Sequence, residues 1–440
     1  MSALSTKPYR GTKDLFPERQ RIRKMIFNVW DEVAHNSAFQ EYSGPILEPL
    51  ELYLAKSSEE IVSEQLFTLT DRSDRKLGIR PEVTPTLARM VASTLGKYPL
   101  PLRWYCVETC MRYERPQRGR MRQFDQLNMD ILGGDIGEGD FEVLATIPQM
   151  MAKLDAPMDG FKVRLNHREF INNYLDKHIS LQGDQRASVL RLLDGFPKTG
   201  EEGLRKEGTS LGLTETEIQK LLALLTTPFT ELLESTNEPS LIYLKQLIDD
   251  LNTACEIDAF EFDATIMRGF DYYTGVIFEV VDISPVNNRA LFGGGRYDNL
   301  VATFGTNSVS GVGYGVSEIS LYNFLEAHNI MPELNPDIEV VAAGLQDDSG
   351  LKTLRKLVQK LRKLGVNCEM LGAGKKPAKV FKYASKIGAN SVIVIGPDEA
   401  ERGTFSVKLL ASRQEQELKI DELNEESLLN LVQQLRENPS

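Results

Sequence analysis

The sequence predicts an α+β protein in which helices flank an antiparallel sheet, followed by a small C-terminal α/β domain. Strand-like segments before residue 332 follow one another without regular crossover helices, which favours antiparallel pairing. Residues 171–240 have a helical pattern, interrupted mainly at residues 197–203, and indicate a helical insertion. After a linker at residues 332–336, strands and helices alternate, which is typical of a mostly parallel sheet. We therefore expect domains at residues 1–170 with 241–331, at 171–240, and at 337–440.

The first expected elements are a helix and a strand that contains proline. Apolar residues recur at helical spacing over residues 17–38. Residues 42–50 are expected to form a strand, and Pro45 and Pro49 place it at the edge of a sheet, because proline has no N–H to donate to a ladder.

A hairpin and a second helix come next. Residues 66–72 and 77–80 flank a short charged turn, a pattern that predicts a β-hairpin. Residues 84–95 have helical periodicity, and Gly96 is placed to end that helix. Further strands of this domain are expected at residues 102–108, 121–132, 276–281 and 311–315.

The C-terminal domain combines the expected alternation with a basic segment. Residues 351–390 contain eleven Lys or Arg and one acidic residue, Glu369. A solvated helix face and a surface for a nucleic-acid backbone are both consistent with this pattern. On a helix, one face would be shared by Lys375, Lys379, Lys382 and Lys386. The strands of the C-terminal domain are expected at residues 339–343, 366–371, 391–396 and 404–410, and its helices near residues 350–364 and 377–387.

Composition limits the possible classes of protein. A chain of 440 residues with 41% hydrophobic content is expected to form two or three domains. No apolar run approaches the roughly 20 residues of a membrane span, and the start lacks the apolar centre of a signal peptide, so we expect a cytoplasmic protein without membrane contact. Four cysteines without a Cys-x-x-Cys pair and only four histidines argue against a zinc site. The net charge of −12 argues against binding of nucleic acid by bulk attraction, so any such contact must use local patches.

Residues 112–126 concentrate positive charge on a short stretch between two apolar runs. Arginine presents a planar fork of donors that matches phosphate oxygens and stays charged at neutral pH. Phe124 follows the cluster and could stack on a base. A solvated charged loop is the alternative interpretation of such a run. The five arginines are Arg112, Arg115, Arg118, Arg120 and Arg122.

Three other unusual strings accompany the arginine segment. They are Gly-Ile-Arg-Pro-Glu-Val-Thr at residues 78–84, Arg-Gly-Phe-Asp-Tyr-Tyr-Thr-Gly at 268–275, and Gly-Gly-Gly-Arg-Tyr-Asp at 293–298. Together these segments resemble the active site of histidyl-tRNA synthetases, which are class II aminoacyl-tRNA synthetases, and the resemblance runs from residue 10 to about residue 420. It implies a class II catalytic domain, a C-terminal anticodon-binding domain and a homodimer. It also implies the activity of a histidine–tRNA ligase, with L-histidine, ATP, Mg²⁺ and tRNA(His) as its partners.

The resemblance implies a phosphate side of the site. Arg112 and Arg268 would be catalytic, because they would stabilise the α-phosphate of ATP from two sides. An ion pair with Asp263 or Asp271 is the structural alternative for Arg268. Glu114 would lie on the adenine or metal side, but no protein metal ligand is assigned. The expected ATP-binding residues are Arg112, Glu114, Arg120, Arg122 and Phe124.

The resemblance also implies a pocket for the amino acid. Glu82 and Thr84 would accept from the α-ammonium, since a carboxylate and a hydroxyl suit its N–H donors. A carboxylate with nearby tyrosine hydroxyls would select the imidazole ring and its tautomer. Asp130 is a shorter acid than some family members carry at this position. The expected histidine-binding residues are Glu82, Thr84, Gln126, Asp130, Arg268, Tyr272, Tyr273 and Tyr297.

One segment departs from the family pattern. The helix after the strand at residues 311–315 usually carries an arginine against the adenine and γ-phosphate, but residues 317–321 read Ser-Glu-Ile-Ser-Leu and place Glu318 or Ile319 there. Either another cation such as Arg122 replaces it, or ATP binds weakly. A non-catalytic histidine-binding relative, such as the regulatory subunit of ATP phosphoribosyltransferase, is therefore the alternative function, although the two expected catalytic arginines and the basic C-terminal domain favour the ligase.

Overall fold

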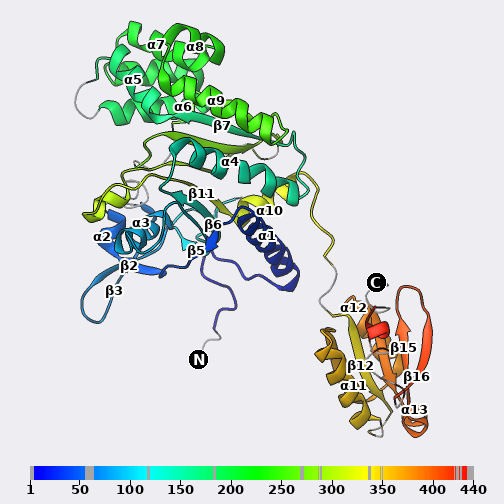
Figure 1. Ribbon diagram of the computed structural model, residues 1–440. Helices are drawn as coiled ribbons and strands as arrows, with labels where there is room; N and C mark the ends of the chain where they lie inside the picture. The colour runs from blue at the N-terminus through cyan, green and yellow to red at the C-terminus, as the bar shows by residue number, and fades with distance from the viewer. Residues whose placement is uncertain are drawn as a thin grey trace. The chain divides into compact units, whose positions relative to one another are not determined.

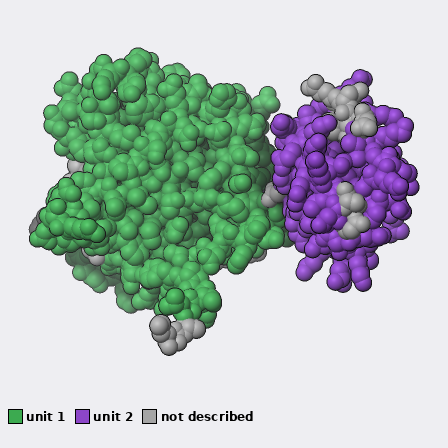
Figure 2. All heavy atoms as spheres, turned by 90° about the horizontal axis from the view of Figure 1, so that it is seen from below, with its two compact units in different colours: residues 1–332 green, residues 333–440 purple. Residues whose placement is uncertain are grey.

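The computed structural model divides into two compact units, Met1–Pro332 and Glu333–Ser440 (Figure 2). The boundary falls at the start of the linker predicted at residues 332–336. The structure describes residues 4–54, 64–115, 119–181, 185–267, 272–285, 287, 290–334, 338–346, 348, 350–420, 422, 426 and 429–433.

An eight-stranded sheet forms the centre of the first unit (Figure 1). Its inner pairs are all antiparallel, and only the two outermost pairs, β1 with β5 and β7 with β8, are parallel. The predicted antiparallel class is therefore confirmed, although the sequence did not predict β1, β7, β8 or β10. In spatial order the strands are β1 (Gln40–Glu41), β5 (Leu102–Met111), β6 (Gln123–Leu132), β11 (Gly311–Ser317), β10 (Ala290–Arg296), β9 (Val276–Asp282), β7 (Phe161–His167) and β8 (Phe260–Phe262).

Four helices pack against one face of this sheet. They are α1 (Pro17–Asn36), α4 (Ile136–Lys153), α9 (Pro239–Ala254) and α10 (Glu318–Ala327). Their apolar side chains form one core with alternate residues of the strands, such as Leu127, Met129 and Ile131 of β6. Because successive strand residues point to opposite faces, the residues between them are left for the other side of the sheet. The helix expected at residues 17–38 is confirmed within two residues.

A second sheet, of three strands, lies beside the short helix α2 (Leu50–Leu54). Its central strand β4 (Lys76–Ile79) pairs antiparallel with β3 (Phe67–Thr70) and with β2 (Leu47–Pro49), so the predicted hairpin is confirmed. The single strand predicted over residues 42–50 is wrong in its length, because only residues 47–49 join this sheet. As expected from its proline, β2 is an edge strand within the described part of the chain.

Helices fill the predicted insertion, and their apolar side chains form a second hydrophobic cluster that also includes Ile266, Met267 and Ile277. The helices are α5 (Arg168–His178), α6 (Gln185–Ser210), α7 (Glu215–Thr226) and α8 (Phe229–Thr236). The break predicted at residues 197–203 is a kink inside α6, where Gly200 has φ 61° and ψ −166°. The helix predicted at residues 84–95 is α3 (Thr84–Ser93), which also belongs to this first unit.

The second unit is a five-stranded mixed sheet with helices. β12 (Val340–Leu345) pairs parallel with β13 (Cys368–Lys375) and β14 (Ser391–Ile395), whereas β15 (Thr404–Leu409) and β16 (Glu415–Lys419) are antiparallel. The expectation of a mostly parallel sheet is therefore wrong in part. The reason is the short connection from β14 to β15 through α13 (Pro397–Arg402), because a parallel crossover needs about a dozen residues or more.

The two larger helices of this unit are α11 (Leu351–Lys363) and α12 (Pro377–Lys386). Lys379, Lys382 and Lys386 are exposed on α12. Lys375 lies in β13 before the helix begins, so the expectation that it shares the helix face is wrong. None of the helices that the structure describes has the length and apolar character needed to cross a membrane.

Candidate active site

A cavity of about 390 Å³ opens on the sheet face opposite the four packed helices. Alternate residues of β6 form one wall: Phe124, Gln126, Asn128 and Asp130. This alternation follows from the period of two in a strand, which sends the residues between them into the core. Asn128 was not among the predicted residues, although the same alternation could have identified it. Glu279 of β9 was missed in the same way.

Glycines of the neighbouring strand make room for these side chains. Gly313 of β11 is paired with Asp130, and a Cβ at Gly313 would lie 2.0 Å from the Asp130 Oδ1 atom. At Gly315 a Cβ would lie 2.5 Å from Gln126 Nε2. Side chains at these two positions would therefore displace the polar groups that line the cavity.

One end of the cavity is acidic and buried. Tyr297 donates a hydrogen bond of 2.5 Å to Asp130 Oδ1, and both residues are at most 2% exposed. Asp130 Oδ2 has no hydrogen-bond partner within the described part of the chain, although buried acceptors are normally paired. Burial raises the pKa of Asp130 to about 7, against the opposing effects of the Tyr297 and Asn128 side chains. This end therefore presents an acceptor that a ligand could complete.

The predicted residues of the amino-acid pocket surround this carboxylate. Tyr272 donates to Glu82 Oε2 at 3.1 Å, and its ring centroid lies 5.0 Å from that of Tyr273 and 5.9 Å from that of Tyr297. Thr84, the first residue of α3, also lines the cavity. Gln126 donates from Nε2 to Asn128 Oδ1 at 2.6 Å. All described residues predicted for histidine are thus brought together.

The other end of the cavity is basic. Arg112, directly after β5, donates from Nε to the carbonyl oxygen of Pro81 at 2.9 Å, and its guanidinium lies 5.2 Å from the ring centroid of Phe124. Among the residues that the structure describes, Arg112 has no ion-pair partner. Glu114 and Arg120 form an ion pair of 3.4 Å and also line the cavity. The guanidinium of Arg112 is therefore available to an anion.

Arg122 lies outside this cavity. It donates from Nη1 to the hydroxyl of Tyr9 at 2.6 Å and lies 4.0 Å above the ring of Tyr113. Its Nε donates to the carbonyl oxygen of Glu114, and its own carbonyl oxygen accepts from the N–H of Arg112 at 2.8 Å. Arg122 thus holds the two sides of the hairpin together.

Three residues named from the sequence lie outside the described residues: Arg118, Arg268 and Asp271. Asp263, the other alternative partner for Arg268, is engaged elsewhere. It pairs with Arg164 at 3.4 Å and accepts from the hydroxyl of Thr265 at 2.7 Å.

The segment that lacks the expected arginine divides between the cavity and the protein interior. Ile319 and Ser320 line the cavity. Glu318 is buried behind it and accepts from the backbone N–H of Asp125 at 3.0 Å. Burial, with the charge of Asp125, raises the pKa of Glu318 to about 7. Within the described lining, the only arginines are Arg112 and Arg120.

The cavity offers few protein ligands for a metal ion. The described residues contain no cluster of three His, Cys, Asp or Glu side chains suited to a metal ion. Mg²⁺ usually takes one or two carboxylates and completes its shell with phosphate oxygens and water. Glu114, at the basic end, fits the role of a single carboxylate ligand beside a bound polyphosphate. The four cysteines form no disulfide with one another.

Comparison with known proteins shows the family of the chain. Residues 11–318 match the family described as histidyl-tRNA synthetase, and residues 339–429 match an anticodon binding domain. The histidine–tRNA ligase of Leptospira biflexa is 36% identical over 413 residues, which cover 93% of this chain and 94% of that protein.

Solved structures agree at the level of the fold. The histidyl-tRNA synthetase of Nostoc sp. PCC 7120 has a TM-score of 0.81 at 21% identity and covers 99% of this chain and 100% of its own. A Bacillus halodurans protein, described as an ATP phosphoribosyltransferase regulatory subunit/histidyl-tRNA synthetase, has a TM-score of 0.72 at 25% identity, covering 90% of this chain and 99% of its own. On the family match, the sequence identity to the Leptospira ligase and the geometry of the cavity, this chain belongs to the histidyl-tRNA synthetase family of aminoacyl-tRNA ligases.

Proposed function

We propose that this histidine–tRNA ligase performs both steps of its reaction in the cavity described above. The observation that carries the proposal is the pairing of a buried acidic end, at Asp130 and Glu82, with a basic end at Arg112 and Arg120. A zwitterionic amino acid with a basic ring fits the first end, and a nucleoside triphosphate fits the second.

The acidic end would bind L-histidine. The imidazole would donate to the open Oδ2 of Asp130, while Tyr297 holds Oδ1 of the same carboxylate. Glu82 and Thr84 would accept from the α-ammonium, with Gln126, Tyr272 and Tyr273 enclosing the ligand. A ligand without a ring donor would leave a buried carboxylate unpaired, which explains rejection of isosteric amino acids.

The basic end would bind ATP and stabilise its reacting phosphate. A carboxylate oxygen of histidine attacks the α-phosphorus, the bond to the bridging oxygen breaks, and pyrophosphate leaves. Arg112 would offset the charge on the α-phosphate, with Arg268 as the second catalytic arginine and a further contact to histidine, and Phe124 would stack on adenine. Mg²⁺, held by Glu114 and the phosphates, would neutralise further negative charge on the phosphates.

Arg120 is our candidate for the outer phosphates. Because residues 317–320 provide no cation, Arg120 is the remaining arginine of the described lining that could reach them. The earlier expectation that Arg122 contacts ATP directly has no support from its contacts with Tyr9 and Tyr113, and we assign it to hold the hairpin instead.

In the second step, a terminal ribose hydroxyl of tRNA(His) would attack the histidyl carbonyl and release AMP. The C-terminal residues 337–440 would bind the anticodon region, with Lys379, Lys382 and Lys386 of α12 contacting backbone phosphates. The helices of residues 171–240 would form a separate inserted domain within the catalytic residues 1–170 and 241–331. We further propose a homodimer, with the edge strand β2 at its interface, and a cytoplasmic location.

The non-catalytic alternative is weaker. A protein that only binds histidine needs neither an anticodon binding domain nor, at the phosphate end, a guanidinium such as that of Arg112, which has no ion-pair partner among the described residues. The fold similarity to the Bacillus halodurans protein does not separate the two functions, because that protein carries both descriptions.

Exchange of pyrophosphate into ATP tests the proposal. The purified chain should catalyse exchange only when histidine is present, and should then charge tRNA(His) with histidine. Exchange without charging would contradict the second step. Histidine binding without exchange at saturating histidine and ATP would support the non-catalytic alternative instead.

A further inference from the structure

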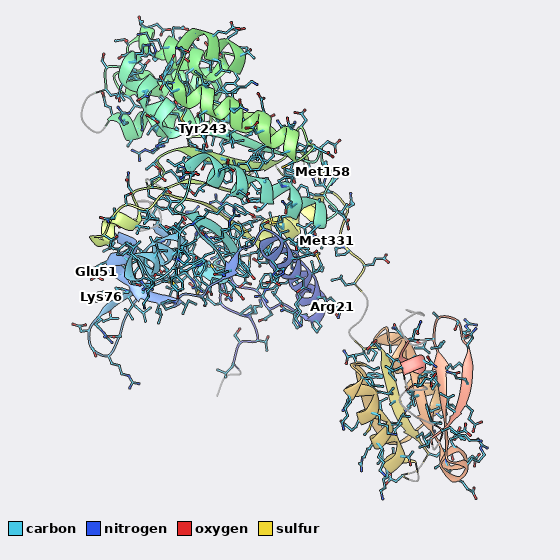
Figure 3. All side chains as sticks on the ribbon, viewed as in Figure 1. Arg21, Glu51, Lys76, Met158, Tyr243 and Met331 are labelled. Carbon is cyan, nitrogen blue, oxygen red and sulfur yellow. The ribbon has the colours of Figure 1, made fainter. Side chains whose placement is uncertain are left out.

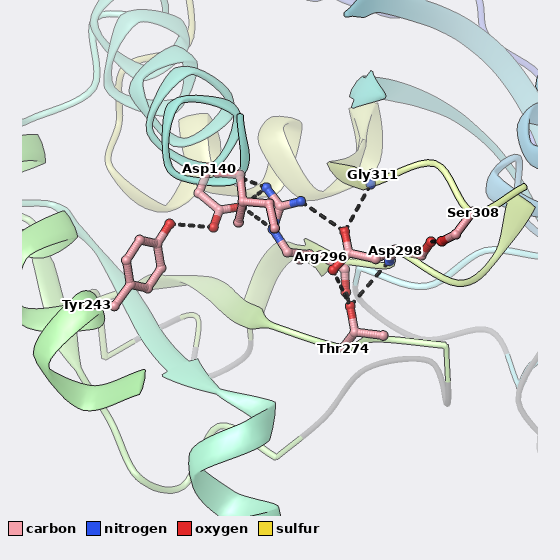
Figure 4. Close-up of polar contacts among 8 residues, drawn as sticks. Asp140, Tyr243, Thr274, Arg296, Asp298, Ser308 and Gly311 are labelled. Atoms are coloured by element: carbon pink, nitrogen blue, oxygen red, sulfur yellow. Dashed lines mark hydrogen bonds and ion pairs between the residues drawn. The ribbon is translucent and has the colours of Figure 1, made fainter. Parts of the chain in front are cut away.

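A buried polar network lies just outside the cavity and centres on Arg296, the last residue of β10 (Figure 4). Arg296 is 4% exposed. It donates to Asp140 Oδ1 from Nε at 2.9 Å and from Nη2 at 2.6 Å, and from Nη2 also to the carbonyl oxygen of Ile136 at 2.8 Å. Its Nη1 donates to Asp298 Oδ1 at 3.0 Å. All three nitrogens of the planar guanidinium therefore donate hydrogen bonds, between α4 and the segment after β10.

The network continues from Arg296 to Thr274. The backbone N–H of Thr274 donates to the carbonyl oxygen of Arg296 at 2.7 Å, and the Thr274 hydroxyl donates to Asp298 Oδ2 at 3.0 Å. The backbone N–H of Asp298 lies 3.2 Å from the same hydroxyl. The segment that contains Thr274 and the segment from Arg296 to Asp298 are thus joined by hydrogen bonds that involve their backbones.

These two segments carry the tyrosines of the histidine pocket. Tyr297 lies between Arg296 and Asp298 in the chain, and Tyr272 and Tyr273 directly precede Thr274. None of Thr274, Arg296 and Asp298 lines the cavity itself. They can therefore affect a ligand only through the backbone that places the tyrosines.

The outer side of the network is anchored in two helices. Asp140 belongs to α4, and its Oδ2 accepts from the hydroxyl of Tyr243 at 2.6 Å. Tyr243, labelled in Figure 3, belongs to α9. Both carboxylate oxygens of Asp140 are consequently occupied, which keeps this buried acid and its arginine in one arrangement.

We propose that Arg296 is a positioning residue for the histidine pocket: through Asp298 and Thr274 it holds the segments that carry Tyr272, Tyr273 and Tyr297. The inference rests on the proposed histidine-binding role of the cavity. Small displacements of positioning groups are costly, because ligand and catalytic groups must meet at hydrogen-bond distance. The effect should fall mainly on histidine, since the described residues of the phosphate end, Arg112, Glu114, Arg120 and Phe124, belong to the separate hairpin.

Two substitutions test the inference. Thr274→Val removes the hydroxyl bonds and keeps the size and the backbone bond of residue 274, and it should raise the KM for histidine in pyrophosphate exchange about tenfold. Arg296→Lys keeps the charge but loses the fork, and it should raise this KM more. Both variants should leave the KM for ATP within about twofold of wild type.

The controls separate positioning from stability. Thr404→Val removes a buried threonine hydroxyl bond, to Glu417 in the second unit, and should not change either KM. Tyr243→Phe removes only the outer bond to Asp140 and should give a smaller change than Thr274→Val. A lower Tm in Thr274→Val and Arg296→Lys with an unchanged KM for histidine would overturn the inference.

Calorimetric titration with L-histidine keeps the test independent of catalysis. If wild type binds histidine but shows no exchange, the ligase function fails, whereas weaker binding by Thr274→Val would still support the positioning role. Equal binding by wild type and both variants would refute that role. If Arg296→Lys fails to fold, the result with Thr274→Val decides.

Discussion

The two ends of the cavity differ in how they are built. Asp130 and Tyr297 at the acidic end are at most 2% exposed and lie in or directly after paired strands. At the basic end, the side chain of Arg120 is 46% exposed and lies on the hairpin between β5 and β6. The first end offers fixed partners in a buried environment, and the second offers charge close to solvent.

This difference matches two recognition problems. Selecting one amino acid requires buried polar groups that a wrong ligand cannot pair with. Leaving such a group without a hydrogen bond costs binding free energy. Holding a polyphosphate requires mainly positive charge, which acts over several ångströms and is screened by salt when exposed. The two ends should therefore respond differently to mutation, pH and salt.

Loss of Arg112 should have the largest effect. Arg112→Ala should lower the kcat of pyrophosphate exchange by about 10³-fold, because it removes a preorganised charge from the reacting phosphate. Histidine binding, measured by calorimetry, should stay within about twofold of wild type. Arg103→Ala, in the preceding strand β5 and paired with Glu142, serves as control. Normal exchange by Arg112→Ala would remove the basis for a catalytic basic end.

Asp130→Asn should have the next largest effect, on the opposite substrate. Replacing one carboxyl oxygen by an NH2 group, which cannot accept from the imidazole, should raise the KM for histidine about 100-fold and leave the KM for ATP unchanged. Asp282→Asn is the matched control, because Asp282 is buried in the same unit and accepts from His328. A similar loss in both variants would indicate general destabilisation instead of ligand selection.

Asp130 should also make stability depend on pH. Burial raises its pKa from 3.8 to about 7, so between these values the folded chain retains a proton that the unfolded chain releases. The free energy of unfolding should therefore fall by about 2 kcal/mol from pH 5 to pH 7 relative to Asp130→Asn. Urea unfolding followed by tryptophan fluorescence reports on the first unit, which contains both Trp30 and Trp104. A pH-independent difference between the two proteins would contradict this assignment.

The smallest effect is expected at Arg120. Arg120→Ala should raise the KM for ATP roughly fivefold, because an exposed charge contributes little, and the increase should diminish at high salt. The KM for histidine should not change. Arg205→Ala, which removes a partly exposed arginine of α6 that pairs with Glu201, is the control. An effect of Arg120→Ala that is independent of salt would mean that the basic end, like the acidic end, binds its ligand through a contact shielded from water.

Local patterns predicted much of this protein. The charged turn at residues 73–76 predicted the β3–β4 hairpin, and helical periodicity predicted α1 and α3 within two residues. The absence of crossover helices predicted the antiparallel sheet. These features depend on neighbouring residues, so one sequence is enough to recognise them.

The sequence by itself determined which residue types could form the site, and the tertiary structure decided which of them meet. Tyr297 and Asp130 are 167 residues apart, and Arg296 and Asp140 are 156 apart. Strand register decided that Asn128 faces the cavity, and packing against Tyr9 and Tyr113 turned Arg122 away from it. The orientation of a side chain depends on neighbours supplied by other strands, and the spacing of residues along one chain does not contain that information.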